Sequence, residues 1–270
     1  MKRYALLGHP LGHSLSPFIH ERLFRLDGLD ENQAEYFLLD ADEEKFRNAV
    51  GELKKLDGFN ITIPYKTRIM EHCRFVDETA EICGAVNCYH DGIGYNTDVI
   101  GFLKTVHGMG AKLSGDVLLL GCGGAGRMIA GEIIRDGGNL TIVDEMNKDL
   151  PDKYRECCTT YSELYRAPRT FSLVINATPV GMFPKTDESP LDFSGIETPF
   201  ALDIIYNPAE TRFLREAKDS GAKTSNGLSM LVLQAAAAHE KIWKLRETPY
   251  SAEELQVIIE ETAKQIAAII

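Results

Sequence analysis

The feature that most constrains the fold is a glycine-rich run placed directly after an apolar segment. Residues 116–120 read Asp-Val-Leu-Leu-Leu, as a buried strand does, and residues 121–126 read Gly-Cys-Gly-Gly-Ala-Gly. A helical pattern then continues to about Asp136 and ends at Gly137-Gly138. Glycines at such a turn let the backbone approach a pyrophosphate, and the helix N-terminus supplies N–H donors. The order strand, glycine turn, helix therefore predicts a dinucleotide-binding βαβ unit.

An acidic residue after the next expected strand indicates which dinucleotide binds. Asp144 lies about 20 residues beyond the first glycine, where a carboxylate hydrogen-bonds the ribose 2′-OH of NAD. The 2′-phosphate of NADP would be repelled there, with Glu145 adding to the repulsion, and Lys148 and Arg127 are the basic residues that would compensate. The sequence therefore predicts NAD in preference to NADP. The alternative is that Asp144 merely caps the following helix.

The composition argues against several classes of partner. A chain of 270 residues forms one or two domains with a sizeable core. Its net charge of −11 argues against nucleic acid and anionic membranes, because both need a basic face. The N-terminal apolar run is too short for a secretory signal, and no run approaches membrane-spanning length. We therefore expect a cytoplasmic protein with a small-molecule substrate, and the sequence leaves monomer and homodimer open.

Candidate metal ligands show no usual spacing. The cysteines include no Cys-x-x-Cys pair, and Cys157 and Cys158 are adjacent, so reduced thiols are expected. His9, His13 and His20 lie close together but at irregular intervals. We predict that the chain holds no metal.

Strand-like and helical patterns alternate along most of the chain, which is typical of an α/β fold with a mostly parallel sheet. Ser16-Pro17 indicates a helix start with Ser16 as the N-cap. The dipeptide at 91–92, Asp-Gly, indicates a hairpin, and Ser251-x-x-Glu254 a capping box. Strands are expected at 4–8, 34–39, 59–63, 85–89, 93–95, 116–120, 140–143, 173–175 and 200–203. Helices are expected at 16–27, 43–56, 97–107, from the glycine run to 136, at 228–245 and at 251–269.

Three polar segments in the N-terminal part hold the candidate catalytic residues. They read Asn-Ile-Thr-Ile-Pro-Tyr-Lys at 60–66, Gly-Ala-Val-Asn at 84–87 and Gly-Tyr-Asn-Thr-Asp at 94–98. Such groups cost free energy when buried without partners, but collected in a cleft they can hold a polyhydroxylated ligand. The ammonium of Lys66 can stabilise a developing alkoxide and deliver a proton, with Asp98 orienting it. An ordinary ion pair between the two is the alternative.

Further polar segments complete an ordered series. Residues 8–20 read Gly-His-Pro-Leu-Gly-His-Ser-Leu-Ser-Pro-Phe-Ile-His, and 96–102 read Asn-Thr-Asp-x-x-Gly-Phe. Residues 176–182 read Asn-Ala-Thr-Pro-Val-Gly-Met, 203–211 Asp-Ile-Ile-Tyr-Asn-Pro-x-x-Thr, and 226–235 Asn-Gly-Leu-Ser-Met-Leu-x-x-Gln-Ala. With the three segments above, this series resembles the shikimate dehydrogenase family, quinate/shikimate dehydrogenases included, over nearly the whole chain.

The resemblance implies two α/β domains around a cleft. Residues 1–100 with 232–270 would form a substrate-binding domain, and 101–231 a Rossmann domain that binds NAD(P). It also implies the reversible reduction of 3-dehydroshikimate to shikimate, a step toward chorismate and the aromatic amino acids.

The resemblance further implies roles for individual positions. Lys66 matches the catalytic lysine, and Asp98 is its expected partner. Ser14, Ser16 and Tyr206 match residues at the substrate carboxylate. The remaining substrate-binding candidates are Asn60, Thr62, Asn87 and Gln234, together with Lys66 and Asp98. The cofactor-binding candidates are Gly121, Gly123, Gly124, Ala125, Asp144, Asn176, Thr178, Ile204 and Gly227.

Some positions depart from the family pattern. Cys88 stands where Thr is usual, and His239-Glu240 where an aromatic residue is frequent. Asp144 opens a run that replaces the Asn-Arg-Thr of NADP-dependent members. Two alternatives stay open: a quinate/shikimate dehydrogenase, and a catalytically idle paralogue that senses a metabolite. Serine at both 14 and 16 favours shikimate over quinate, and an intact Lys66 argues against the idle paralogue.

Overall fold

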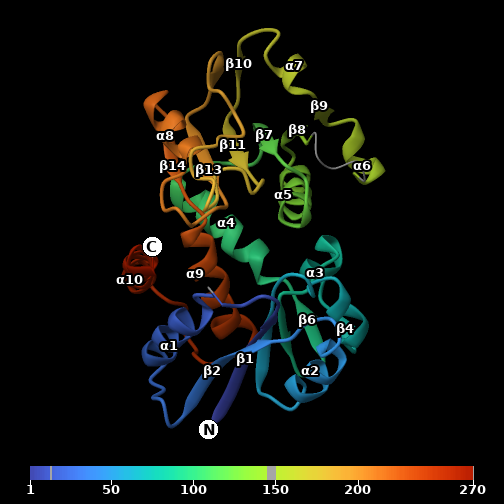
Figure 1. Cartoon of the computed structure of the whole chain (residues 1–270), viewed down its shortest axis with the longest axis vertical. Helices are drawn as coiled ribbons and strands as arrows, with labels where there is room; N and C mark the ends of the chain where they lie inside the picture. Colours follow the sequence, from blue (N-terminus) through green and yellow to red (C-terminus); the bar gives the residue numbers. More distant parts are fainter. Residues whose placement is uncertain (13, 145–149, 270) are drawn as a thin grey trace. The chain divides into compact units, whose positions relative to one another are not determined.

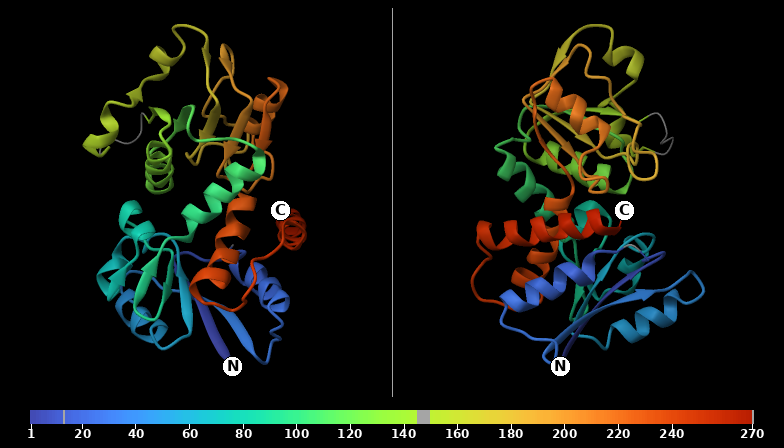
Figure 2. Two further views of the ribbon diagram at one scale, coloured as in Figure 1. Left: turned by 180° about the vertical axis from the view of Figure 1, so that it is seen from behind. Right: turned by 60° about the vertical axis from the view of Figure 1, so that its left-hand side comes forward.

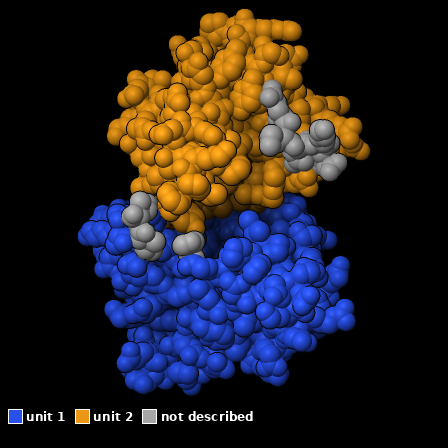
Figure 3. Space-filling view, in the orientation of Figure 1, with its two compact units in different colours: residues 1–101, 231–270 blue, residues 102–230 orange. Residues whose placement is uncertain are grey.

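The computed structural model describes residues 1–12, 14–144 and 150–269, and these form two compact units. Unit 1 consists of Met1–Gly101 and Leu231–Ile270, and unit 2 of Phe102–Met230 (Figure 3). The expected boundaries lie one residue from this division. Helices α4 (Thr97–Met109) and α9 (Leu228–Ala237) carry the chain from one unit into the other.

The sheet of unit 1 is mixed and has the strand order β2-β1-β3-β5-β6-β4 (Figure 1). Strand β1 pairs in parallel with β2 and β3, whereas β5 runs antiparallel to β3 and β6. The strands are β1 (Lys2–Gly8), β2 (Ala34–Asp40), β3 (Gly58–Ile61), β4 (Phe75–Val76), β5 (Cys88–His90) and β6 (Ile93–Tyr95).

The hairpin expected between β5 and β6 is confirmed. Asp91 and Gly92 both have positive φ, 44° and 85°. This is the backbone that a two-residue hairpin turn requires, and Asp-Gly is the dipeptide that best tolerates it.

The helices of unit 1 cover both faces of this sheet (Figure 1). They are α1 (Ser16–Leu26), α2 (Phe46–Leu53), the 3-10 helix η1 (Arg68–His72), α3 (Glu78–Cys83), the π-helix η2 (Ala238–Ile242) and α10 (Ala252–Ile269). Helix α10 lies beside α1 (Figure 2), and Arg22 pairs with Glu261 between them. The predicted capping box is present: the Glu254 amide donates to Ser251 Oγ, and the Ser251 amide donates to the Glu254 carboxylate.

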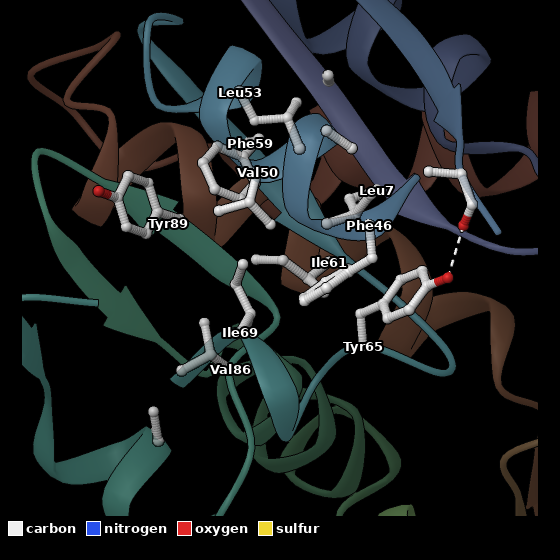
Figure 4. Close-up of a cluster of buried hydrophobic side chains, with 14 residues drawn as sticks. Leu7, Phe46, Val50, Leu53, Phe59, Ile61, Tyr65, Ile69, Val86 and Tyr89 are labelled. Carbon is white, nitrogen blue, oxygen red and sulfur yellow. Dashed lines mark hydrogen bonds between the residues drawn. The ribbon is translucent and has the colours of Figure 1, made fainter. Parts of the chain in front are cut away.

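Alternation along β1 separates two cores, because successive side chains point to opposite faces. Tyr4 packs with Phe24 of α1 and with Trp243. Ala5 and Leu7 point the other way, into the cluster formed by α2, η1 and α3. Figure 4 shows this second cluster, in which the hydroxyl of Tyr65 also donates to the backbone carbonyl of Ala41, just after β2.

The single helix expected at 228–245 is wrong. Helix α9 ends at Ala237 and is followed by the π-helix η2, where the Trp243 amide donates to the Ala238 carbonyl at 2.8 Å. Lys244 then takes a positive φ of 49°, which ends the helix. The wider turn places the indole of Trp243 against Gly58, where even a Cβ would lie 2.3 Å from the indole nitrogen.

Unit 2 contains the predicted parallel sheet, in the order β14-β13-β11-β7-β8-β9. Its strands are β7 (Asp116–Leu120), β8 (Asn139–Val143), β9 (Cys158–Thr159), β11 (Leu173–Asn176), β13 (Phe200–Asp203) and β14 (Lys223–Ser225); β10 (Arg169–Thr170) and β12 (Ile196–Glu197) pair separately. Its helices are α5 (Gly124–Arg135), α6 (Asp152–Arg155), α7 (Tyr161–Leu164) and α8 (Arg212–Asp219). In the described part of the chain, no helix is long and apolar enough to cross a membrane.

A buried carboxylate ties the loops of unit 2 together at the end of β13. Asp203 is fully buried and accepts hydrogen bonds from Thr211 Oγ1 at 2.6 Å, Asn176 Nδ2 at 3.1 Å and the Ile205 amide at 3.0 Å. Burial raises the pKa of Asp203 to about 6, and the three donors oppose that rise. The carboxylate thus joins the ends of β11 and β13 to the start of α8.

The raised pKa of Asp203 predicts a pH-dependent contribution to stability. The folded state holds the proton more tightly than the unfolded chain, so this contribution is complete below about pH 4 and is lost as the pH rises through about 6. The stability advantage of the wild type over Asp203→Asn should therefore shrink by up to roughly 3 kcal/mol from about pH 3 to about pH 7. Urea unfolding of both proteins at each pH measures it. An advantage that does not change with pH would contradict the prediction.

Candidate active site

Lys66 and Asp98 form an ion pair within unit 1, with Nζ and Oδ2 2.7 Å apart. Lys66 lies in the turn that follows β3, and Asp98 lies in the first turn of α4. Their side chains are 32% and 20% exposed, so both are partly buried and still accessible to solvent. An ammonium held in this way is accessible to a ligand and has a fixed direction.

Asn87 holds the other oxygen of the same carboxylate. Its Nδ2 lies 2.8 Å from Asp98 Oδ1, and its Oδ1 accepts from the Thr97 amide at 2.7 Å. Asn87 Nδ2 also lies 3.4 Å from Gln234 Oε1, on α9. The side chain is buried, which leaves it little freedom to move. The structure therefore brings Lys66, Asn87, Asp98 and Gln234 into one hydrogen-bonded network.

Two residues of this network were not singled out as site candidates from the sequence. The hydroxyl of Thr97 contacts both Asn87 Oδ1 and Gln234 Oε1 at 3.2 Å. Asn96 Oδ1 accepts from the Asp98 amide at 3.0 Å, and its Nδ2 donates to the Ala85 carbonyl. Both lie inside the 94–98 segment, so their polarity at the end of a strand was the available signal.

Ser14, Ser16, Asn60 and Thr62 also belong to unit 1. Asn60 is buried in β3, where its Oδ1 accepts from the Tyr36 hydroxyl at 2.9 Å and its Nδ2 donates to the backbone carbonyl of Asn87. Thr62 is partly buried just after β3, and its amide donates to the backbone of β1.

The prediction that Ser16 caps α1 is wrong. Ser16 is the first residue of the helix, Leu15 is the N-cap, and no side chain caps it. The Ser16 amide donates instead to Ser14 Oγ at 3.3 Å. The two hydroxyls are therefore not committed to capping, and they lie two residues apart at the start of a helix, where an anion is favoured.

The glycines in the glycine-rich loop of unit 2 differ in how much space surrounds them. Gly121 has a φ of 84°, and a Cβ there would lie 2.6 Å from the Thr178 side chain. By contrast, no described atom lies within 4 Å of where a Cβ would stand at Gly123 or Gly124. Both are exposed, as is Ala125, at the N-terminus of α5. The loop thus leaves room beside a helix N-terminus, which fits a dinucleotide pyrophosphate.

Asp144 follows β8 and bonds to the same loop. Its Oδ2 accepts from the Cys122 amide at 2.6 Å. The next described helix, α6, has Pro151 as its N-cap and no side-chain cap, so Asp144 does not cap it. Glu145 and Lys148, which entered the cofactor argument, lie outside the described residues.

The other cofactor candidates lie at the carboxyl ends of β11 and β13. Asn176 Oδ1 accepts from the Thr178 amide at 2.9 Å and from its hydroxyl at 2.7 Å. Gly227 packs so closely on Ile204 that a Cβ would lie 1.9 Å from the Ile204 carbonyl oxygen. Asn176 and Gly227 therefore shape loops from within. Tyr206 follows Ile204 closely, and burial raises the pKa of its phenol.

The histidines named as candidate metal ligands make other contacts. His9 Nδ1 contacts Asp40 at 2.6 Å, and His20 Nδ1 contacts His239. His13 lies outside the described residues, and the described residues contain no cluster suited to a metal ion.

Comparison with known proteins adds an independent observation. Residues 6–89 match the family model of the shikimate dehydrogenase substrate-binding domain. The chain is 39% identical over 259 residues to the shikimate dehydrogenase (NADP(+)) of Methanococcus maripaludis, covering 90% of this chain and 91% of that protein.

Solved structures resemble the whole chain as well. The shikimate 5-dehydrogenase of Thermus thermophilus, in complex with NADP(H) and shikimate, is 32% identical with a TM-score of 0.84, over 97% of this chain and 99% of that one. The Listeria monocytogenes enzyme, in complex with shikimate and NAD, is 26% identical with a TM-score of 0.82, over 97% and 96%. The α/β fold predicted from the sequence, with its Rossmann-like unit, is thereby confirmed. The chain belongs to the shikimate dehydrogenase family.

Proposed function

We propose that the chain catalyses the reversible, NAD(P)-dependent reduction of 3-dehydroshikimate to shikimate. The observation that carries the proposal is the Asp98 carboxylate held between Lys66 Nζ at 2.7 Å and Asn87 Nδ2 at 2.8 Å. It lies next to the segment that matches the substrate-binding family model. In this role the enzyme would act in the cytoplasm, on the route to chorismate and the aromatic amino acids.

The proposed chemistry assigns a separate task to each polar group. A nicotinamide dinucleotide, when bound, supplies or accepts the hydride. Lys66 stabilises negative charge that develops on the ring oxygen and gives that oxygen its proton. Asp98 keeps the ammonium directed at the substrate. Asn87 and Gln234, with Asn60 and Thr62, would bind the ring hydroxyls, and Ser14, Ser16 and Tyr206 would bind the carboxylate.

An idle Lys66–Asp98 ion pair is the competing interpretation. Exposed pairs of this kind contribute little to stability, typically about 0–1 kcal/mol. A pair that serves only as a surface contact would not need Asn87, a buried side chain, to hold its second carboxylate oxygen. That extra constraint supports a catalytic task for the lysine.

We also propose that NAD is preferred to NADP. Support comes from the Asp144 carboxylate, which lies beside the glycine-rich loop and would repel a 2′-phosphate. The Methanococcus relative is named for NADP(+), and the Thermus structure holds NADP(H), so these relatives do not support the preference. The Listeria structure holds NAD.

Replacing Lys66 tests the proposed activity. Lys66→Ala should lower kcat for shikimate oxidation by about 10²- to 10⁴-fold, because in this direction the variant lacks the group that accepts the proton of the reacting hydroxyl. Initial rates from nicotinamide absorbance measure it, and circular dichroism checks the fold. Lys45→Ala is the matched control, since Lys45 also pairs with an aspartate, Asp42, at 2.9 Å but is 72% exposed. A fall in kcat of less than tenfold for Lys66→Ala would refute a catalytic role for this lysine. Assaying quinate in parallel tests whether the enzyme also oxidises that compound.

Replacing Asp144 tests the cofactor preference. Asp144→Asn keeps an oxygen that can accept from the Cys122 amide while removing the charge. We expect the wild type to favour NAD in kcat/KM. The variant should shift the NADP-to-NAD ratio of kcat/KM upward by roughly tenfold or more, since like-charge repulsion is relieved. A wild type that clearly prefers NADP would overturn the proposed preference and leave the proposed reaction standing.

A further inference from the structure

A line of buried, hydrogen-bonded polar side chains runs through unit 1 on the α1 side of its sheet. The Tyr250 hydroxyl donates to Asp27 Oδ1 at 2.6 Å, and Asp27 Oδ2 lies 2.7 Å from His239 Nδ1. His239 Nε2 in turn lies 2.9 Å from Nδ1 of His20. The side chains of Asp27 and His239 are fully buried, and His20 is 1% exposed. These three titratable groups are thus linked in a line away from solvent.

The hydrogen bonds determine which ring nitrogens carry protons. The Asp27 carboxylate can only accept, so His239 must carry its proton on Nδ1. Burial lowers the pKa of both histidines, which keeps the rings neutral, although Asp27 opposes that shift at His239. A neutral His239 then accepts at Nε2, and His20 must donate from Nδ1. One arrangement of protons satisfies the whole line.

His20 connects this line to two substrate-binding candidates. It lies one helical turn after Ser16 in α1, and its ring stacks on Tyr36 with centroids 3.9 Å apart and planes 7° apart. The Tyr36 hydroxyl donates to Asn60 Oδ1 at 2.9 Å. Burial raises the pKa of that phenol well above its usual value, and a hydrogen bond from Ser16 opposes the rise. Tyr36 therefore touches Ser16 and Asn60 at once.

If His239 had only a structural role, a hydrocarbon ring at this position would be buried at a lower free-energy cost. His239 lies among the aromatic rings of Phe24, Trp243 and His20. Burying a carboxylate beside them costs free energy unless every donor is in place. The charged groups around the line are Glu240 and Arg246. The Glu240 carboxylate accepts from the Tyr250 amide, whereas Arg246 has its Nη1 3.9 Å from Asp27 Oδ1 and stacks on the Tyr250 ring, with Glu254 beyond it.

We propose that His20 and His239 are positioning residues for shikimate binding. Through the fixed hydrogen bond between them, they hold the ring of Tyr36, and with it Ser16 and Asn60, in the orientation that receives the substrate. The inference rests on the proposed function. It assigns the His239–His20 bond to substrate affinity, and the His239–Asp27 bond to the stability of the fold.

Two substitutions of His239 separate these bonds. In His239→Asn the amide nitrogen replaces Nδ1, so the bond to Asp27 is kept and the acceptor for His20 is lost. In His239→Gln the amide reaches the position of Nε2, so the acceptor for His20 is kept and the donor to Asp27 is lost. The comparison therefore removes one link at a time.

The two variants should affect different measurements. His239→Asn should raise KM for shikimate, and its Kd by calorimetry, roughly tenfold, with kcat within about twofold and a melting temperature lowered less than in His239→Gln. His239→Gln should lower the melting temperature and leave KM near that of the wild type. KM for the cofactor should stay constant in both variants.

Tyr250→Phe is the control, because it removes a donor to Asp27 without touching His20. It should lower the melting temperature without raising KM. Wild-type KM and Kd in His239→Asn, or a KM that follows melting temperature across the three variants, would overturn the inference while the proposed function stands. A wild type that neither binds nor turns over shikimate would overturn both.

Discussion

The geometry of the candidate site depends on one carboxylate that is held from two directions. Asp98 accepts from Lys66 at one oxygen and from Asn87 at the other. These residues come from the turn after β3, the segment before β5 and the first turn of α4, so the carboxylate joins three parts of the chain. Because both of its oxygens accept a hydrogen bond, the Asp98 side chain has little freedom to rotate. Its bond to Lys66 therefore holds the ammonium in one orientation.

Unit 2 repeats the same construction with different partners. Asp203 collects donors at the end of β13, and Asp144 accepts from the glycine-rich loop at the end of β8. Both lie at the carboxyl ends of parallel strands, where the loops of an α/β sheet converge and ligands bind. Asp203 is fully buried and engaged with its own loops, whereas Asp144 is only partly buried beside the exposed N-terminus of α5. The first shapes the loops from within, and the second lies where a ligand can reach it.

Local patterns were a reliable guide where a short segment sets its own backbone. The hairpin at Asp91-Gly92, the capping box at Ser251 and the strand-to-helix glycine turn all follow from residues within a few positions of one another. The short strand β14 and the charged helix α8 were missed, because β14 has the polar sequence Lys-Thr-Ser and α8 carries few apolar residues. Their placement comes from packing against β13 rather than from their own composition.

The sequence by itself determined the α/β class, the glycine-rich loop and the polar segments that hold the site candidates. These depend on periodicity and on residue type, which are local properties. Only the tertiary structure decided that Asn87 and Gln234 meet beside Asp98, that Ser16 does not cap its helix, and that α9 is followed by the π-helix η2. The first and the last depend on contacts between residues distant in sequence, namely Asn87 with Gln234 and Trp243 with Gly58. The line from Asp27 to His20 passes through His239, at the other end of the chain, and its single arrangement of protons exists only once the fold has buried it.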